Sequence, residues 1–113
     1  MIPPLIQLAS YAEQPAGALE QVANAQRLVA ELLRCQRNWI ELDFTGVNGI
    51  GEAFCVEFFR LATSELADVW LLPCHYRLCC NSMVKRLQER VKHQREAAWM
   101  KGCERFSTCN HPT

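Results

Sequence analysis

The cysteines and histidines are the residues of this chain whose types are suited to metal or redox chemistry. The sequence contains seven cysteines and three histidines. Most of them fall in two clusters, the first made of Cys74, His75, Cys79 and Cys80 and the second of Cys103, Cys109 and His111. Thiolates and imidazoles are common zinc ligands. The spacing does not favour zinc, because there is no Cys-x2-Cys pair and vicinal cysteines rarely bind one metal together. We therefore expect no metal and no other cofactor, and the sequence leaves a metal or redox role of the clustered cysteines open.

A disulfide framework is not expected either. The number of cysteines is odd, and the N-terminal Met1-Ile2-Pro3-Pro4 shows no basic segment followed by an apolar one, so we expect no signal peptide. Cys35 and Cys55 lie in apolar, helix-like surroundings and are predicted to be small core residues. No apolar run approaches the roughly 18 residues of a membrane span. These features predict a cytoplasmic protein without a membrane segment.

The acidic residues do not form a catalytic pair. Asp43 lies at the end of a predicted strand, where it can accept hydrogen bonds from the backbone of the following turn. A catalytic carboxylate needs a histidine, a lysine or a second acid nearby, and Glu41 points to the opposite face of the strand. No cysteine–histidine arrangement for nucleophilic catalysis is visible. The sequence predicts that the protein is not an enzyme.

The charge is distributed unevenly along the 113 residues, although twelve basic residues balance twelve acidic ones. Residues 1–80 have five basic and nine acidic residues, a net charge of −4, and residues 81–113 have seven basic and three acidic ones, a net charge of +4. This asymmetry indicates either a basic surface for an acidic partner or the solvated face of a C-terminal helix. An overall charge near zero does not favour a dedicated nucleic-acid binder.

Hydrophobic periodicity predicts an alternation of strands and helices. Strands are expected at 5–8, 39–44 and 68–72, the last closed by Pro73, and 74–78 is either a short edge strand or a loop. Helices are expected at 17–36, 52–66 and from Asn81 to about Met100, where Gly102 ends the third helix. The glycine-rich segment 46–51 is expected to be a loop.

This order predicts one α/β domain over residues 1–102 and a flexible tail at 103–113. Its mixed sheet would have about four strands, with helices packed on one face. Trp39, Phe44 and Trp70 are expected in the core. Phe54 and Phe59 fall on different faces of the helix 52–66, which is apolar over more than one stripe, and one of them is expected to be exposed as a binding hot spot.

Residues 40–59 carry the most informative motif. Leu42-Asp43-Phe44 ends a strand, Gly46-Val47 and Ile50 form the turn, and Phe54, Glu57 and Phe58 open the next helix. This pattern resembles the signature of STAS-like domains, the relatives of anti-sigma-factor antagonists. Weaker similarity continues through 68–72 and 81–95, so the resemblance covers roughly residues 38–95.

The resemblance implies a non-catalytic regulatory module that binds another protein, such as a histidine-kinase-like ATPase. In the antagonists, a kinase-like partner phosphorylates the first serine of an Asp-Ser-Ser run in this turn. The matching positions here are Gly51, Glu52 and Ala53, so the phosphorylatable serine is missing. Glu52 either stabilises the helix N-terminus through the helix dipole, by up to about 1 kcal/mol, or acts as a permanently phosphoserine-like surface.

The resemblance implies a partner-binding surface made of the turn and the following helix. Its predicted members are Gly46, Asn48, Gly49, Gly51, Glu52, Cys55 and Phe59. One alternative is a small inhibitory protein, of the kind encoded by mobile elements or phages, that blocks a host nucleic-acid-binding complex. Another alternative is direct nucleic-acid binding through a basic helix face made of Lys85, Arg86, Arg90, Lys92 and Arg95. A homodimer, formed through the apolar helix or the strand at 5–8, is also open.

Overall fold

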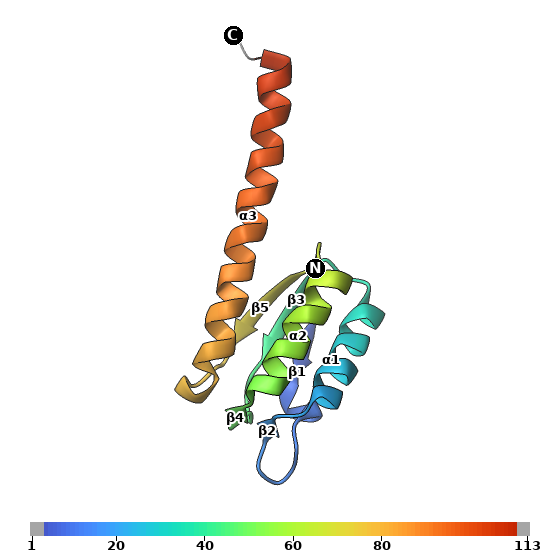
Figure 1. Ribbon diagram of the computed structural model, residues 1–113, viewed down its shortest axis with the longest axis vertical. Helices are drawn as coiled ribbons and strands as arrows, with labels where there is room; N and C mark the ends of the chain where they lie inside the picture. The colour runs from blue at the N-terminus through green and yellow to red at the C-terminus, as the bar shows by residue number, and fades with distance from the viewer. Residues whose placement is uncertain (1–3, 111–113) are drawn as a thin grey trace.

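The computed structural model describes the backbone of residues 4–110 and the side chains of residues 4–99. Strands and helices alternate along the chain (Figure 1). The strands are β1 (Leu5–Gln7), β2 (Ala18–Leu19), β3 (Trp39–Asp43), β4 (Gly49–Ile50) and β5 (Trp70–Cys74). The helices are α1 (Val22–Cys35), α2 (Glu52–Glu65) and α3 (Asn81–Asn110), with short 3-10 turns at Leu8–Tyr11 and Leu78–Cys80.

The strands form two small parallel sheets. The order in the larger sheet is β1-β3-β5, with both pairs parallel, and β2 pairs with β4 separately. The α/β class is confirmed, but the prediction of one mixed sheet of about four strands is wrong. Parallel neighbours require helical crossovers, and α1 and α2 provide them. In this register Gln7, Asp43 and Cys74 are paired, so the three strands end at one edge of the sheet.

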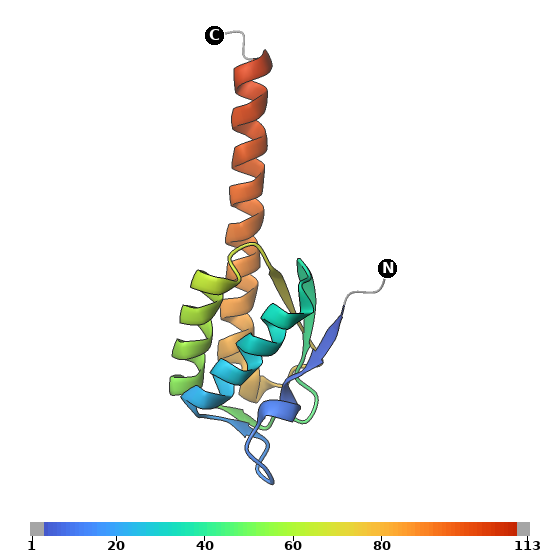
Figure 2. The ribbon, with the colours of Figure 1, turned by 90° about the vertical axis from the view of Figure 1, so that its right-hand side faces the viewer.

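A single apolar core joins the sheet to all three helices. Ile40 and Leu42 of β3 are fully buried, and Phe44 follows them into the core. Figure 2 shows α1 and α2 on one side of the three-stranded sheet. Trp39 alternates to the other side, is half exposed and stacks on Trp70 with the ring centroids 6.2 Å apart. The expectation that Phe44 is a core residue is confirmed, but the same expectation for Trp39 is wrong, because side chains alternate between the faces of a strand.

The segment before α1 contains a strand where a helix was expected. The predicted helix 17–36 begins only at Val22, because Ala18 and Leu19 pair with Gly49 and Ile50 as β2 and β4. The prediction of a continuous loop over 46–51 is corrected in the same way. Two-residue strands leave no periodic pattern in a sequence, and only the long-range pairing defines them.

Gly17 fits tightly against the turn that precedes α2. Its φ of +69° is unfavourable for other residues, and a Cβ there would lie 2.8 Å from the Asn48 side-chain nitrogen and from the Gly46 carbonyl oxygen. The Asn48 N–H donates to the Gly17 carbonyl over 2.8 Å, and the Asn48 side-chain nitrogen donates to the Ala16 carbonyl over 3.2 Å. The loop over 13–18 and the turn over 46–51 therefore hold each other in place.

The second helix and the strand after it agree closely with the sequence pattern. Helix α2 was expected at 52–66 and spans Glu52–Glu65. Strand β5 includes Pro73, which was expected to end it. Proline is tolerated there because β5 is an edge strand of the three-stranded sheet.

The third helix is longer than its predicted end near Met100. Helix α3 contains 30 residues, and its backbone continues through Gly102 to Asn110. A glycine inside a helix costs only about 1 kcal/mol, so it weakens the helix without ending it. Met83, Val84 and Leu87 bury the first turns of α3 in the core, and the later turns extend away from the sheet (Figure 2).

Candidate functional site

A groove of about 530 Å³ runs between α2 and α3. Its walls come from two helices that are well separated in sequence, so neither helix alone defines it. The lining residues are Phe59, Thr63 and Ala67 from α2 and its end, and Arg86, Glu89, Arg90, His93, Gln94 and Ala97 from α3. Residues from both surfaces proposed on the sequence therefore meet in this groove.

Phe59 and Arg86 form the best-defined contact in the groove. The guanidinium carbon of Arg86 lies 4.4 Å from the centre of the Phe59 ring, a cation–π distance. Phe59 is half-buried, and its inner side meets the buried Phe58 ring edge-on at 5.1 Å. Phe54, the alternative hot spot, is fully buried. Phe59 is therefore the aromatic residue of α2 that a partner can reach beside an exposed cation.

Cys55 lies under this contact and not on the surface. Its side chain is only 2% exposed, so the prediction that a partner touches Cys55 is wrong. Burial raises the pKa of the Cys55 thiol, while nearby Arg86 lowers it and Glu52 raises it. The thiol therefore stays protonated and serves as a core residue, as its apolar surroundings in the sequence indicated. Glu52 is exposed at the first position of α2.

Arg90 closes the inner wall of the groove and is not available to an external phosphate. Its guanidinium donates to the Val69 carbonyl over 2.8 Å, to the Ala62 carbonyl over 3.5 Å and to the Leu66 carbonyl. Burial lowers the pKa of Arg90. The Ala62 and Leu66 carbonyls lie at the C-terminal end of α2, where a cation is favoured by the helix dipole, and Val69 directly precedes β5. The assignment of Arg90 to a basic nucleic-acid surface is therefore wrong.

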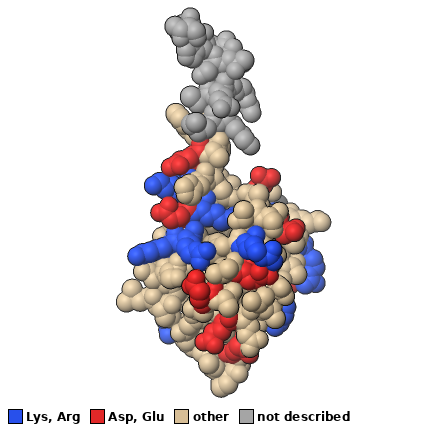
Figure 3. Space-filling model, in the orientation of Figure 1, with Lys and Arg blue, Asp and Glu red and all other residues tan. Residues whose placement is uncertain are grey.

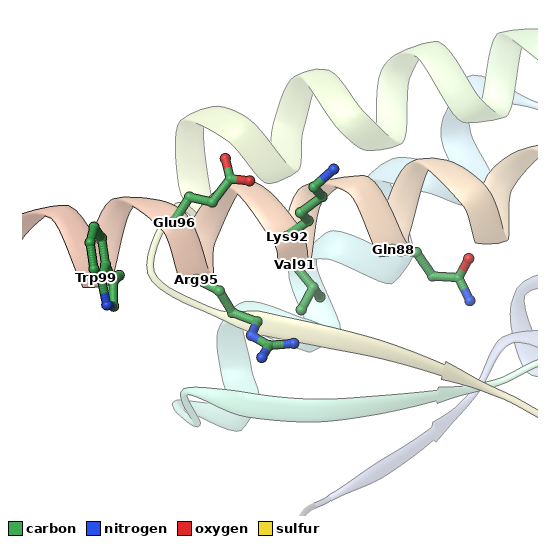
Figure 4. Close-up of a pocket in the computed structure, with 6 residues that line it drawn as sticks. All are labelled: Gln88, Val91, Lys92, Arg95, Glu96 and Trp99. Carbon is green, nitrogen blue, oxygen red and sulfur yellow. The ribbon is translucent and has the colours of Figure 1, made fainter.

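The other predicted basic residues do not form one continuous face. Lys85, Arg86, Lys92 and Arg95 are exposed. Figure 4 shows Lys92 and Glu96 leaving α3 on one side, while Val91 and Arg95 leave it on another, around a second hollow of about 780 Å³. Figure 3 shows acidic side chains among the Lys and Arg side chains over this part of the molecule.

His93 lies between two acidic residues of α3. Its ring nitrogens are 4.0 Å from a Glu89 carboxylate oxygen and 3.9 Å from a Glu96 carboxylate oxygen. The side chain of His93 is 74% exposed, so it faces solvent. Acidic residues at these positions lower the positive potential that a nucleic acid would require along α3.

The turn residues of the predicted partner-binding surface mostly make contacts with other parts of this chain. Gly46 and Asn48 are exposed, and Gly49 and Gly51 are half-buried. Asn48 accepts a hydrogen bond of 3.4 Å from Arg77, in addition to its contacts with the loop over 13–18. The Gly51 N–H donates to the Leu19 carbonyl over 2.7 Å. The structure thus places Phe59 in the groove between α2 and α3, leaves Glu52 outside its lining, and packs the turn against the segment that contains β2.

A second cluster lies at the edge where β3 and β5 end. Asp43, Cys74 and His75 each place a potential ligand atom within 4.8 Å of the others. The distance between Asp43 Oδ1 and His75 Nδ1 is 3.2 Å, and Oδ1 also accepts from the Thr45 N–H at 3.0 Å and the Thr45 hydroxyl at 2.7 Å. No histidine was expected near Asp43, and that expectation is wrong, because His75 lies beside it. The sequence signal was partial, because the first strand was expected to end beside Asp43 but the second was expected to end at residue 72, before Cys74.

Burial and hydrogen bonding act in opposite directions on the Asp43 carboxyl. Burial raises its pKa, but the hydrogen bonds from Thr45 and His75 outweigh burial and hold the pKa below its usual value. At Cys74, burial and the nearby charges of Asp43 and Glu41 all raise the pKa of the thiol. The cluster thus pairs a carboxylate that is held ionised with a thiol that is held protonated.

The remaining cysteines do not extend this cluster within the described side chains. Cys79 is exposed and Cys80 is buried, with their sulfur atoms 3.8 Å apart. Burial and the neighbouring Cys79 raise the pKa of Cys80 to about 11. The side chains of Cys103, Cys109 and His111 lie outside the described residues.

The fold and the groove define a small α/β domain with a parallel three-stranded sheet and a two-helix surface groove. Comparisons with family models, with curated proteins and with solved structures find no match. Within the described residues, no helix has the length and apolar character needed to cross a membrane.

Proposed function

We propose that this chain is a non-catalytic regulatory module that binds an acidic, amphipathic helix of a partner protein in the groove between α2 and α3. The observation that carries the proposal is the half-buried Phe59 beside the exposed Arg86, at a distance of 4.4 Å, inside a groove built by two helices. Aromatic residues, phenylalanine among them, and arginine are enriched at the centre of protein interfaces.

The shape of the groove suits a helical segment. Grooves between helices bind amphipathic helices through apolar anchors spaced by three or four residues. Phe59 and Thr63 are one helical turn apart on α2, and Arg86, Arg90 and His93 follow each other at the same spacing on α3. A partner helix of three to four turns would contact both rows at once.

The charge of α3 indicates an acidic partner. Over Asn81–Trp99 there are five basic and two acidic residues, a net charge of +3. Figure 3 shows several Lys and Arg side chains over this part of α3, with acidic side chains among them. Complementary charge accelerates association and selects against basic partners.

The resemblance to STAS-like domains supports a regulatory role, since the helix after the glycine-rich turn is part of their binding surface. An inhibitory protein of the mobile-element or phage type would use the same groove to occupy a host complex. Direct nucleic-acid binding is less well supported, because Arg90 is engaged by carbonyl groups and acidic residues interrupt the basic positions of α3.

The proposal is tested with synthetic helical peptides about 14 residues long, or four turns. Three peptides contain the same apolar residues. The first carries glutamates on its polar face and the second carries lysines there. The third has the composition of the first in a scrambled order that is not amphipathic. Binding is measured by fluorescence anisotropy to the wild-type chain, to Arg86→Glu and to Lys92→Glu. Both variants reverse one exposed charge on α3, but only Arg86 lines the groove.

We expect the acidic peptide to bind wild type best and to lose at least about tenfold in affinity on Arg86→Glu, or about 1.4 kcal/mol. Lys92→Glu should change the affinity less than threefold, since rim charges contribute little. Equal binding of the three peptides, or equal loss in both variants, would show that the groove is not the docking site. A labelled oligonucleotide that binds with a steep salt dependence would favour the nucleic-acid alternative.

A further inference from the structure

We propose that Asp43, Cys74 and His75 form a binding site for a divalent transition metal ion, with Zn²⁺ the best fit to the donors. Each residue offers one ligand atom, and all three atoms lie within 4.8 Å of each other. A tetrahedral zinc ion about 2.0–2.3 Å from each ligand requires its ligand atoms to be roughly 3.3–3.8 Å apart. The distance of 3.2 Å between Asp43 Oδ1 and His75 Nδ1 is already close to that spacing.

The sheet register explains why these residues meet. Asp43 is the last residue of β3 and Cys74 the last residue of β5, and the two are direct partners across the parallel pair. His75 is the next residue after Cys74. The carboxyl ends of neighbouring parallel strands are the usual position of ligand sites in α/β folds.

The backbone at His75 is held in an uncommon conformation. Its φ is +55°, in the left-handed region that non-glycine residues rarely adopt. This conformation turns the His75 ring back toward Asp43 Oδ1. Local strain of this kind tends to persist where the side chain has a functional role.

Asp43 is also oriented by a second layer of contacts. The backbone N–H and the hydroxyl of Thr45 both donate to its carboxylate. Both bonds go to Oδ1, the oxygen that faces His75, and metal-binding carboxylates are commonly oriented by such hydrogen bonds. The Asp43 side chain is 8% exposed and that of His75 is 68% exposed, so the cluster lies below the surface on one side and opens to solvent on the other.

The donor set has the chemistry of a zinc site with an open position. A thiolate, an imidazole and a carboxylate together suit a borderline metal ion better than Mg²⁺ or Ca²⁺, which prefer oxygen ligands alone. The Cys74 thiol releases its proton to solvent as the metal–sulfur bond forms. The two negative ligands then balance the two positive charges of Zn²⁺. Three protein ligands leave a fourth position for water or for a group of a bound partner.

The test is direct titration of the full, reduced chain with Zn²⁺ in competition with a chromophoric chelator, and separately with Co²⁺. We expect one Zn²⁺ ion per chain and a thiolate-to-cobalt charge-transfer band. Cys74→Ala and His75→Asn should each weaken Zn²⁺ binding at least about tenfold, since even outer-shell changes cost 10–100-fold. Asparagine is chosen at position 75 because it tolerates the left-handed conformation.

Two controls separate this site from the other cysteines. Cys79→Ser removes an exposed thiol that is not part of the cluster, and it should leave Zn²⁺ binding unchanged. A Cys103→Ser, Cys109→Ser double variant should also bind like wild type. Circular dichroism establishes that each variant is folded. Wild-type binding no tighter than that of Cys74→Ala, or binding lost only in the control variants, would overturn the proposal.

Discussion

Replacing Arg90 by alanine should destabilise the domain strongly, although sequence reasoning placed this residue on a nucleic-acid-binding face. The guanidinium donates to the Ala62 and Leu66 carbonyls at the end of α2 and to the Val69 carbonyl just before β5. The Arg90 side chain is half-buried. Truncation therefore removes hydrogen bonds, a favourable charge and packing at once.

The magnitude follows from the two shorter contacts, those to Val69 and Leu66. A hydrogen bond to a charged group contributes about 1.5–3 kcal/mol, and water partly replaces it because the site is only half-buried. A cation at a helix C-terminus adds about 0.3–1 kcal/mol. We expect Arg90→Ala to reduce the free energy of unfolding by about 2–4 kcal/mol. Arg90→Lys should be intermediate, because an ammonium group lacks the planar fork of the guanidinium.

Urea denaturation followed by circular dichroism measures this change. Arg95→Ala is the matched control, since Arg95 lies on the same helix with an exposed side chain, and it should stay within about 0.5 kcal/mol of wild type. If Arg90→Ala were as stable as Arg95→Ala, the inferred role of Arg90 as a cap on α2 would be refuted. Arg90 would then again be a candidate member of the basic helix face.

Two further predictions concern the loops and the surface of α1 and α2. Gly17→Ala should destabilise the domain by more than about 1 kcal/mol in urea titrations, because of its positive φ and the facing turn at 2.8 Å, whereas Gly49→Ala, with nothing within 4 Å of the new Cβ, should cost much less. The Glu57 carboxyl should titrate at a pKa of about 2 in NMR spectra, because hydrogen bonds from Arg60 and then Gln26 lower it. Its contribution to stability is present above the usual pKa of about 4.3 and is lost as pH falls toward 2. Gln26→Ala should raise the Glu57 pKa, and an unchanged value would contradict this assignment.

The elements that sequence reasoning predicted well are those with a strong local signal. Strand β3 alternates in polarity and was placed within one residue, and α2 begins at Glu52 as expected after the glycine-rich turn. Gly51 is extended and precedes the helix without a side-chain cap, so the glycine itself marks the boundary. Patterns within one element are enough when the period is clear.

The parts that could not be predicted depend on pairing between distant residues. Strands β2 and β4 exist only because Ala18 pairs with Gly49 and Leu19 with Ile50. The exposure of Trp39 depends on which face of the sheet the helices cover, and that is not a local property.

For the same reason, the sequence did not predict that Phe59 and Arg86 belong to one site. Phe59 and Arg86 were assigned to two competing surfaces, one for a protein and one for nucleic acid. Packing of α3 against the core brings them to 4.4 Å and makes them parts of one groove. A basic residue that covers an aromatic ring is less suited to a phosphate than to a carboxylate beside an apolar anchor. The structure therefore turns two alternatives into one testable surface.

The groove and the Asp43–Cys74–His75 cluster can be tested independently, because no residue of the cluster lines the groove. If the chain binds both Zn²⁺ and an acidic helix, Arg86→Glu should lower the affinity for the peptide and leave the affinity for Zn²⁺ unchanged. Cys74→Ala should lower the affinity for Zn²⁺ and leave the affinity for the peptide unchanged. If a group of the partner fills the fourth position of the metal, the two sites are no longer independent. Loss of Zn²⁺ would then weaken binding of the whole partner protein and leave binding of the isolated peptide unchanged. That comparison distinguishes a metal that stabilises the end of the sheet from one that takes part in recognition.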